Sequence, residues 1–306
     1  MGWHLPVLRR IPHESRQCQR HDNGQIIQGA AMLAQIFFIV WRESVEALLV
    51  IGILSAWMTA NDAAAGGKKY LWGGVVAGIA AAFALAAALM IFANALSGEA
   101  QDWFQTGLVL LAGLLIVQMV FWMQAHGRTL KSDLHSGLAE AADKRQWWGV
   151  FALALIAVAR EGSETVVFLY GILSAGADAA GGLGSALGAI LGGFALALVT
   201  YGLLQLGRRW LSWRLFFRIT ETLLLLLACQ MFTSGAEKLI GLGILPFTDP
   251  LWDTSWLLND ASRFGGVIAG LTGYRALPGM ITVAVWALYW ATVLGFRVRP
   301  KRVRVA

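Results

Sequence analysis

The sequence predicts an all-α polytopic membrane protein with seven transmembrane helices, arranged as a 3+3 inverted repeat plus one C-terminal helix. Three observations support this prediction: an apolar composition, seven long apolar segments and a motif that occurs twice. Of the 306 residues, 58% are hydrophobic and 14% are charged, whereas soluble domains are about a quarter charged. This composition is typical of a chain that lies in a membrane.

The seven apolar segments are long enough to cross a bilayer, which takes about 20 mostly apolar residues per helix. No segment of strand length shows the alternating pattern of a half-buried strand. The predicted spans are Leu33–Met58, Tyr70–Leu96, Phe104–Met123, Trp148–Leu173, Leu183–Leu206, Thr222–Ile240 and Met280–Phe296.

The basic residues predict the orientation of these spans. Lys and Arg gather in the loops after helices one, three and five and in the tail from Arg297 to Arg304, whereas the loops after helices two and four contain none. Because cytoplasmic loops are enriched in Lys and Arg, we expect the N-terminus outside and the C-terminus in the cytoplasm. The same distribution indicates membrane topology rather than nucleic-acid binding, and membrane lipid is the expected surrounding.

The chain divides into five parts on this prediction. The first is an extramembrane leader, which carries four Arg although the topology places it outside, and to which we assign no function. Met32 stands directly before the first helix and is an alternative start, so the leader need not belong to the native chain. The parts are a leader 1–31, a first three-helix repeat with a cytoplasmic loop 32–146, a second three-helix repeat 147–242, an extracytoplasmic loop 243–279, and the seventh helix with its basic tail 280–306.

An internal repeat relates the first and fourth helices. The first reads W-R-E-S-V-E-A-L-L-V-I-G-I-L-S-A from Trp41, and the fourth reads A-R-E-G-S-E-T-V-V-F-L-Y-G-I-L-S-A from Ala159. The helix after each copy contains spaced glycines, which allow helices to approach closely: Gly74 and Gly78 in one, and Gly184, Gly188 and Gly192 in the other. Three helices separate the copies, so the two halves have opposite orientations. This is the inverted-repeat plan of many transporters, whose site lies at the repeat interface.

The motifs place six ionisable groups inside apolar spans. A charged residue at the centre of a transmembrane helix costs about 2.5–3.5 kcal/mol, so these groups require partners or a polar cavity. Residues four apart share a helix face, which pairs each Arg with the second Glu of its motif. Four glutamates against two arginines leave a net negative cluster that can hold protons or a hard cation. The glutamates are Glu43, Glu46, Glu161 and Glu164, and the charge-balancing arginines are Arg42 and Arg160.

A purely structural alternative, two salt bridges that hold helices together, leaves Glu43 and Glu161 unpaired.

Other candidate site residues are weaker. Glu237 beside Lys238 is either an outer, low-affinity carboxylate or an interfacial ion pair. Met119, Met123 and His126 share one helix face and either guide an ion towards the cytoplasm or simply pack. Glu221 is expected to open the sixth helix, where an acid favours the helix dipole.

Two R-E-x-x-E motifs, in helices one and four of seven, resemble the oxidase-dependent iron permease family. The stretch F-W-M-Q-A-H-G-R-T-L-K from Phe121 and the loop elements Leu251-Trp252-Asp253 and Gly273-Tyr274-Arg275 are similar to that family as well. The first motif has Ser44-Val45 where the family usually has Gly-Leu, a minor departure because neither residue is a proposed ligand.

The resemblance implies a transporter, not an enzyme, that imports iron across the cytoplasmic membrane on the glutamates of both motifs. Iron is then the transported ion, ferric after oxidation by a partner, and no cofactor is expected to stay bound. The family implies extracytoplasmic partners: a multicopper ferroxidase, or peroxidase-like and iron-binding proteins. Two alternatives remain open from the residues: a permease for lead or a divalent cation, and an intramembrane prenyl-pyrophosphate phosphatase. The second lacks the Ser/Arg-rich phosphate-binding loop that such an enzyme needs.

Overall fold

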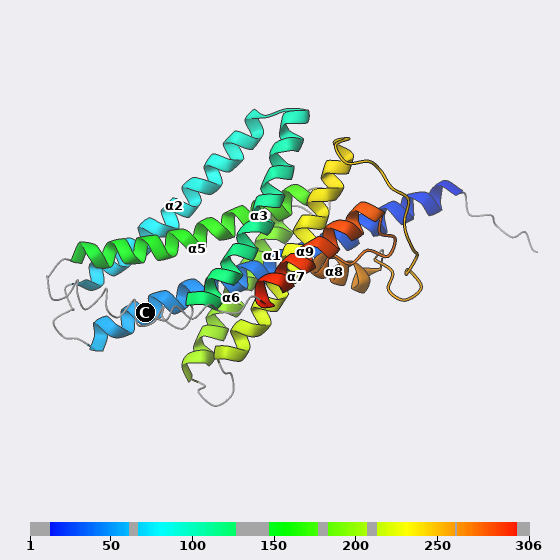
Figure 1. Cartoon of the computed structure of the whole chain (residues 1–306). Coiled ribbons are helices and arrows are strands. Elements are labelled where there is room, and N and C mark those ends of the chain that lie inside the picture. Colours follow the sequence, from blue (N-terminus) through cyan, green and yellow to red (C-terminus); the bar gives the residue numbers. More distant parts are fainter. Residues whose placement is uncertain are drawn as a thin grey trace, which may run out of the picture.

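The computed structural model describes residues 13–60, 67–126, 147–176, 183–206, 213–260 and 262–298, and this part of the chain is helical with short connections (Figure 1). No strand is found among these residues, apart from one isolated bridge between Pro250 and Gly279. The helices are α1 (His13–Ala60), α2 (Lys68–Ala95), α3 (Glu99–His126), α5 (Trp147–Gly176), α6 (Leu183–Leu206), α7 (Trp213–Gly241), α8 (Arg263–Thr272) and α9 (Met280–Val298).

Every predicted span falls on one of these helices, and five of the described helices are long and apolar enough to cross a membrane: α2, α3, α6, α7 and α9. The all-helical, membrane-spanning class is therefore confirmed. The other two long helices, α1 and α5, each contain three charged motif residues within their apolar stretch. The sixth predicted span is too short, because α7 begins at Trp213 rather than at Thr222.

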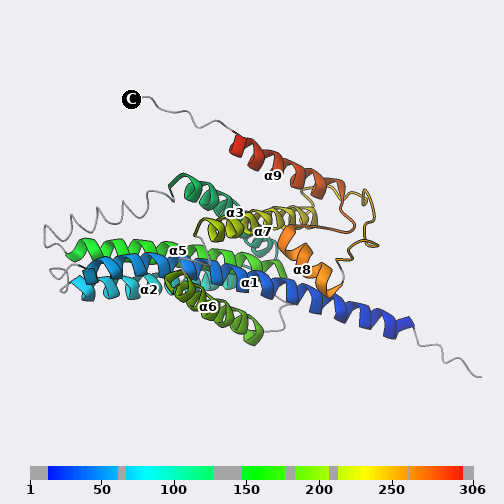
Figure 2. The ribbon, with the colours of Figure 1, turned by 90° about the horizontal axis from the view of Figure 1, so that it is seen from below.

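The helices pack around a central pair. α1 contacts α5, α6 and α8, and α5 contacts α2 and α3 as well. Figure 2 shows α2 beside α5, and α3 beside α7 with α9 outermost. α6 and α9 therefore lie on opposite sides of the molecule, and the motif-bearing helices α1 and α5 lie between them.

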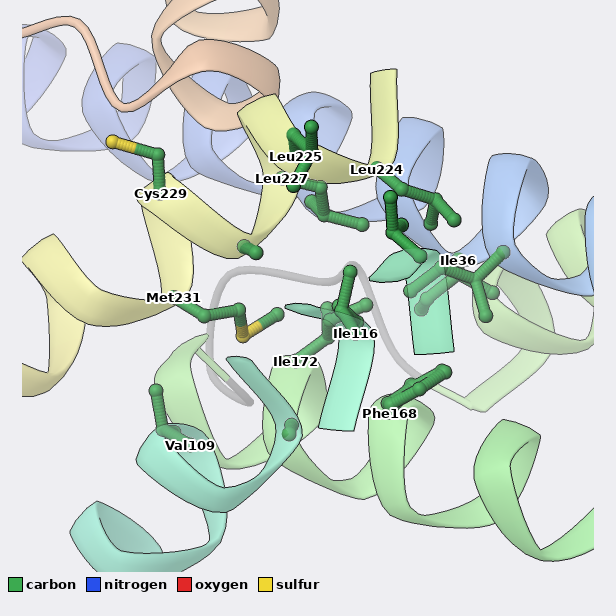
Figure 3. Close-up of a cluster of buried hydrophobic side chains, with 14 of the residues drawn as sticks. Ile36, Val109, Ile116, Phe168, Ile172, Leu224, Leu225, Leu227, Cys229 and Met231 are labelled. Atoms are coloured by element: carbon green, nitrogen blue, oxygen red, sulfur yellow. The ribbon is translucent and has the colours of Figure 1, made fainter. Parts of the chain in front are cut away.

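A buried apolar cluster joins α1, α3, α5 and α7 (Figure 3), and it also includes Ala186 of α6 and Tyr289 of α9. Ile36 of α1, Ile116 of α3, Phe168 of α5 and Leu224 of α7 are each almost fully buried within it. In a membrane, burial of apolar groups against one another gains little over lipid, so close packing and polar contacts hold such helices together.

Glycines allow the closest helix approaches, as the sequence predicts, but not at every predicted position. A Cβ on Gly74 or Gly78 of α2 would collide with α5 around Ala154 and Val158. In α6 the tight contact with α1 is made by Gly193 and its neighbour Gly192, whereas Gly184 and Gly188 have nothing within 4 Å. α2 thus approaches α5 closely, and α6 approaches α1 closely.

The loop between α7 and α9 folds back onto the bundle through α8, a helix that the sequence analysis did not anticipate. Ser262 caps its N-terminus by accepting a hydrogen bond from the Gly265 amide at 3.0 Å. Gly273 ends it in the left-handed conformation, with φ 74°, which favours glycine. The buried Gln35 of α1 donates a hydrogen bond to the carbonyl of Gly270. This contact fixes α8 against α1 a few turns before the first motif.

Candidate metal centre between α1 and α5

Arg42 is the most enclosed charged group among the described residues. Its side chain is fully buried in α1, and its Nη1 donates to Glu43 Oε1 at 2.7 Å. Its Nη2 lies 2.5 Å from Glu46 Oε1, which confirms the pairing that the i, i+4 spacing predicts. Glu43 is also paired, contrary to the structural alternative, so Arg42 balances both acids of its motif.

Arg42 also contacts two sulfur atoms of α3. Its Nη1 lies 3.0 Å from Met119 Sδ, and its Nη2 lies 3.6 Å from Met123 Sδ. Two of the three predicted accessory residues on this face of α3 therefore lie at the first motif. The side chain of the third, His126, lies outside the described residues.

Arg160 of the second motif has a different environment. Its Nε donates to Glu164 Oε1 at 3.0 Å, again the predicted i, i+4 pair, but its side chain is 36% exposed. Its guanidinium lies over the ring of Trp122, 4.2 Å from the centroid. No salt bridge to Glu161 is found within the described part of the chain. The second motif thus leaves one carboxylate without a cation.

Three of the four predicted glutamates converge across the α1–α5 interface. One carboxylate oxygen from each of Glu43, Glu161 and Glu164 lies within 4.8 Å of the others. Each of the three also has a buried Oε2 that lacks a hydrogen-bond partner among the described residues. Buried acceptors are normally satisfied, and leaving one unpaired costs about 1–3 kcal/mol. Glu46 is not part of this set of three; its Oε1 pairs with Arg42, as Oε1 of Glu43 does.

This arrangement can bind a hard cation or share protons. Carboxylate oxygens are ligands for hard ions, and three carboxylates with one oxygen each within 4.8 Å of the others offer a partial coordination shell. Two arginines against four glutamates leave a net negative charge when all are ionised. A cation would satisfy the unpaired oxygens and compensate that charge at the same time.

Glu237 has a different partner from the one considered in the sequence analysis. It accepts two hydrogen bonds from Arg275 of the loop between α8 and α9, from Nε at 2.8 Å and from Nη2 at 2.7 Å, so pairing with Lys238 is wrong. Lys238 instead donates to the Ser174 carbonyl at 3.1 Å. Desolvation acts to lower the pKa of the partly exposed Arg275, but the pair with Glu237 raises this pKa above its ordinary value.

Glu221 does not open a helix, because α7 begins two turns earlier, and the helix-dipole interpretation is wrong. It accepts a hydrogen bond from Gln124 Nε2 of α3 at 3.2 Å. Sequence reasoning named Trp122 and Arg275 only within stretches similar to the family and assigned a contact to neither. Trp122 stands one residue before Met123 in a stretch already singled out, but no periodicity shows that it faces Arg160 on another helix.

A model of the Iron permease FTR1 family matches residues 32–298. The chain belongs to this family. Among curated relatives, the ferrous iron permease EfeU of Escherichia coli O6:H1 (strain CFT073) is 30% identical over 274 residues, covering 87% of this chain and 95% of that protein. EfeU of Yersinia pestis is 28% identical over 273 residues, covering 87% of this chain and 93% of that protein. No solved structure matches the chain.

Membership of the family confirms the resemblance drawn from the two motifs. It makes the protein a transporter of the iron permease family rather than an enzyme, so the intramembrane phosphatase alternative is set aside. Iron is its transported substrate, and the several apolar helices agree with a multi-pass membrane protein.

Proposed function

We propose that the protein imports iron through a site formed by Glu43, Glu161 and Glu164 between α1 and α5. The observation that supports this most directly is their convergence, with three buried oxygens left unpaired. Arg42 and Arg160 balance part of the negative charge while no ion is bound. Glu46 completes the set when Arg42 releases it.

The ion at the site is proposed to be ferric. Carboxylates are hard ligands, and ferric iron is harder than the ferrous ion. The relatives are named ferrous iron permeases, whereas the ion proposed at this site is ferric. A partner that oxidises ferrous iron outside the membrane, of the ferroxidase or peroxidase-like kind, would reconcile the two. A permease for another hard ion remains the second candidate, since the same oxygens would bind it.

The proposal includes seven spans, with α1 and α5 added to the five apolar helices, and a 3+3 inverted repeat. The contact pattern supports the repeat: α2 packs on α5 as α6 packs on α1, and the third helices α3 and α7 pack on each other. Movement of one half against the other would then expose the site to each side in turn. The protein is proposed to lie in the cytoplasmic membrane. By the positive-inside rule, its C-terminal tail would face the cytoplasm, and its N-terminus and α8 would lie outside.

The test is uptake of radioactive iron into cells that lack their own iron import, comparing wild type with Glu43→Ala/Glu161→Ala at equal membrane abundance. We expect iron uptake by wild type and none by the double variant. Supplying either ferrous iron with ascorbate or ferric citrate tests which oxidation state is imported. Competing Mn²⁺, Zn²⁺ and Pb²⁺ test the selectivity for iron. Normal uptake by the double variant would refute the site, and preferential competition by another metal would favour the second candidate.

A further inference from the structure

One face of α3 contacts the arginines of both motifs. Met119 and Met123 lie at Arg42, and Trp122 lies against Arg160. Residues at i, i+3 and i+4 share a helix face, so a single stretch of α3 reaches side chains on two different helices. Neither R-E-x-x-E motif contains a residue of α3.

These contacts hold a guanidinium without neutralising it. A thioether sulfur is a weak, uncharged acceptor, and an aromatic face attracts a cation through its quadrupole. Arg42 needs little from them, because two carboxylates already fix it in a fully buried position. Arg160 is half-exposed and has one ion pair, so the ring supplies its second fixed contact.

The position of Arg160 matters because Glu161 is the carboxylate without a cation. An arginine side chain is long, and on one helix turn Glu161 and Glu164 are both within its reach. If the guanidinium moved to pair with Glu161, it would neutralise the carboxylate that a metal ion needs as a ligand. The stack on Trp122 opposes this movement.

We propose that Trp122 is a positioning residue: it keeps Arg160 on Glu164 and thereby leaves Glu161 free for the transported ion. This inference rests on the proposed function, since it requires Glu161 to be a ligand. It assigns to α3 a role in setting the affinity of the site although α3 provides no ligand of its own.

A double-mutant cycle in the uptake assay tests the inference, with wild type, Trp122→Leu, Arg160→Gln and Trp122→Leu/Arg160→Gln at equal membrane abundance. We expect Trp122→Leu to raise the KM for iron by about 3- to 30-fold, the range of a partly to fully desolvated cation–π contact, with Vmax within about twofold. In the Arg160→Gln background, removal of Trp122 should leave KM unchanged, because no guanidinium remains to move.

Two further variants separate positioning from general damage. Trp122→Phe keeps an aromatic face and should restore most of the affinity, and Trp103→Leu, at an exposed position on the same helix, should behave as wild type. An equal rise in KM in both Arg160 backgrounds would overturn the inference, as would unchanged KM in Trp122→Leu. If Glu43→Ala/Glu161→Ala also transports normally, the proposed site itself has failed. If that double variant is inactive, only the role of Trp122 is refuted.

Discussion

The two R-E-x-x-E motifs are nearly identical in sequence and unlike in surroundings. Arg42 is fully buried and bound by Glu43, Glu46 and two methionine sulfurs, whereas Arg160 is 36% exposed and bound by Glu164 and an aromatic ring. Part of the difference arises from α3, which lies beside both motifs but presents sulfur to one and indole to the other. A repeated motif therefore fixes which groups are present, and the neighbouring helices decide what each group does.

The largest expected effect is a difference in protein stability between variants of the two arginines. Arg42→Gln leaves two buried carboxylates without a cation, and breaking a buried pair in this way costs about 3–5 kcal/mol. Arg160→Gln breaks one partly exposed pair, which costs about 1 kcal/mol or less. We therefore expect Arg42→Gln to lower the thermal midpoint and abundance of the detergent-purified protein strongly, and Arg160→Gln to change them little. Equal losses, measured by fluorescence-detected size exclusion after heating, would show that the two motifs are energetically alike.

The next effect distinguishes the three converging glutamates from Glu46, which lies outside that set. Glu161→Gln removes a charge from the converging set, and a charge-assisted contact is worth about 1.5–3 kcal/mol, which is about 10- to 100-fold in KM for iron uptake. Glu46→Gln should raise KM less, because Glu46 lies outside the converging set. Uptake rates measured over a range of iron concentrations, with abundance checked by immunoblot, decide the order. A larger rise in KM for Glu46→Gln than for Glu161→Gln would indicate that the ion binds to Glu46 instead.

The glycine contacts allow the packing of α2 on α5 to be compared with the packing of α6 on α1. Gly78→Leu and Gly193→Leu should each destabilise the protein by about 1–3 kcal/mol, since each inserts a side chain where helices touch. Gly188→Leu is the matched control, because nothing lies within 4 Å of that position. Thermal midpoints of the three variants check this. A loss in only one of the two halves would argue against equivalent packing of α2 on α5 and α6 on α1.

The sequence predicted the helices well because apolar length and Lys/Arg placement are local signals that tertiary packing rarely overrides in a membrane. It also predicted both i, i+4 ion pairs, which depend only on helix geometry. It could not predict that Glu43 meets Glu161 and Glu164 while Glu46 does not. That outcome depends on the rotation of α1 against α5, which no pattern within one helix encodes.

The same reason explains the error at Glu237. Its sequence neighbour Lys238 suggested a local pair, but adjacent helix residues point in different directions. Lys238 contacts α3 and α5, and Glu237 meets Arg275, which is 38 positions away. Likewise α8 was missed because a ten-residue helix is too short to be recognised by apolar length, although Ser262 and Gly273 are ordinary cap residues.

The smallest expected effect concerns this outer pair and contrasts it with the central acids. Glu237 and Arg275 are partly exposed, at 39% and 29% of their side chains, so the pair is worth about 1 kcal/mol or less. If it only anchors the outer loop, Glu237→Gln and Arg275→Gln should each reduce iron uptake by no more than a few-fold, and the double variant should be no worse than either. If Glu237 instead binds incoming iron, the two variants should change the KM for iron in opposite directions. Arg275→Gln would then free the carboxylate and lower KM, whereas Glu237→Gln would raise it.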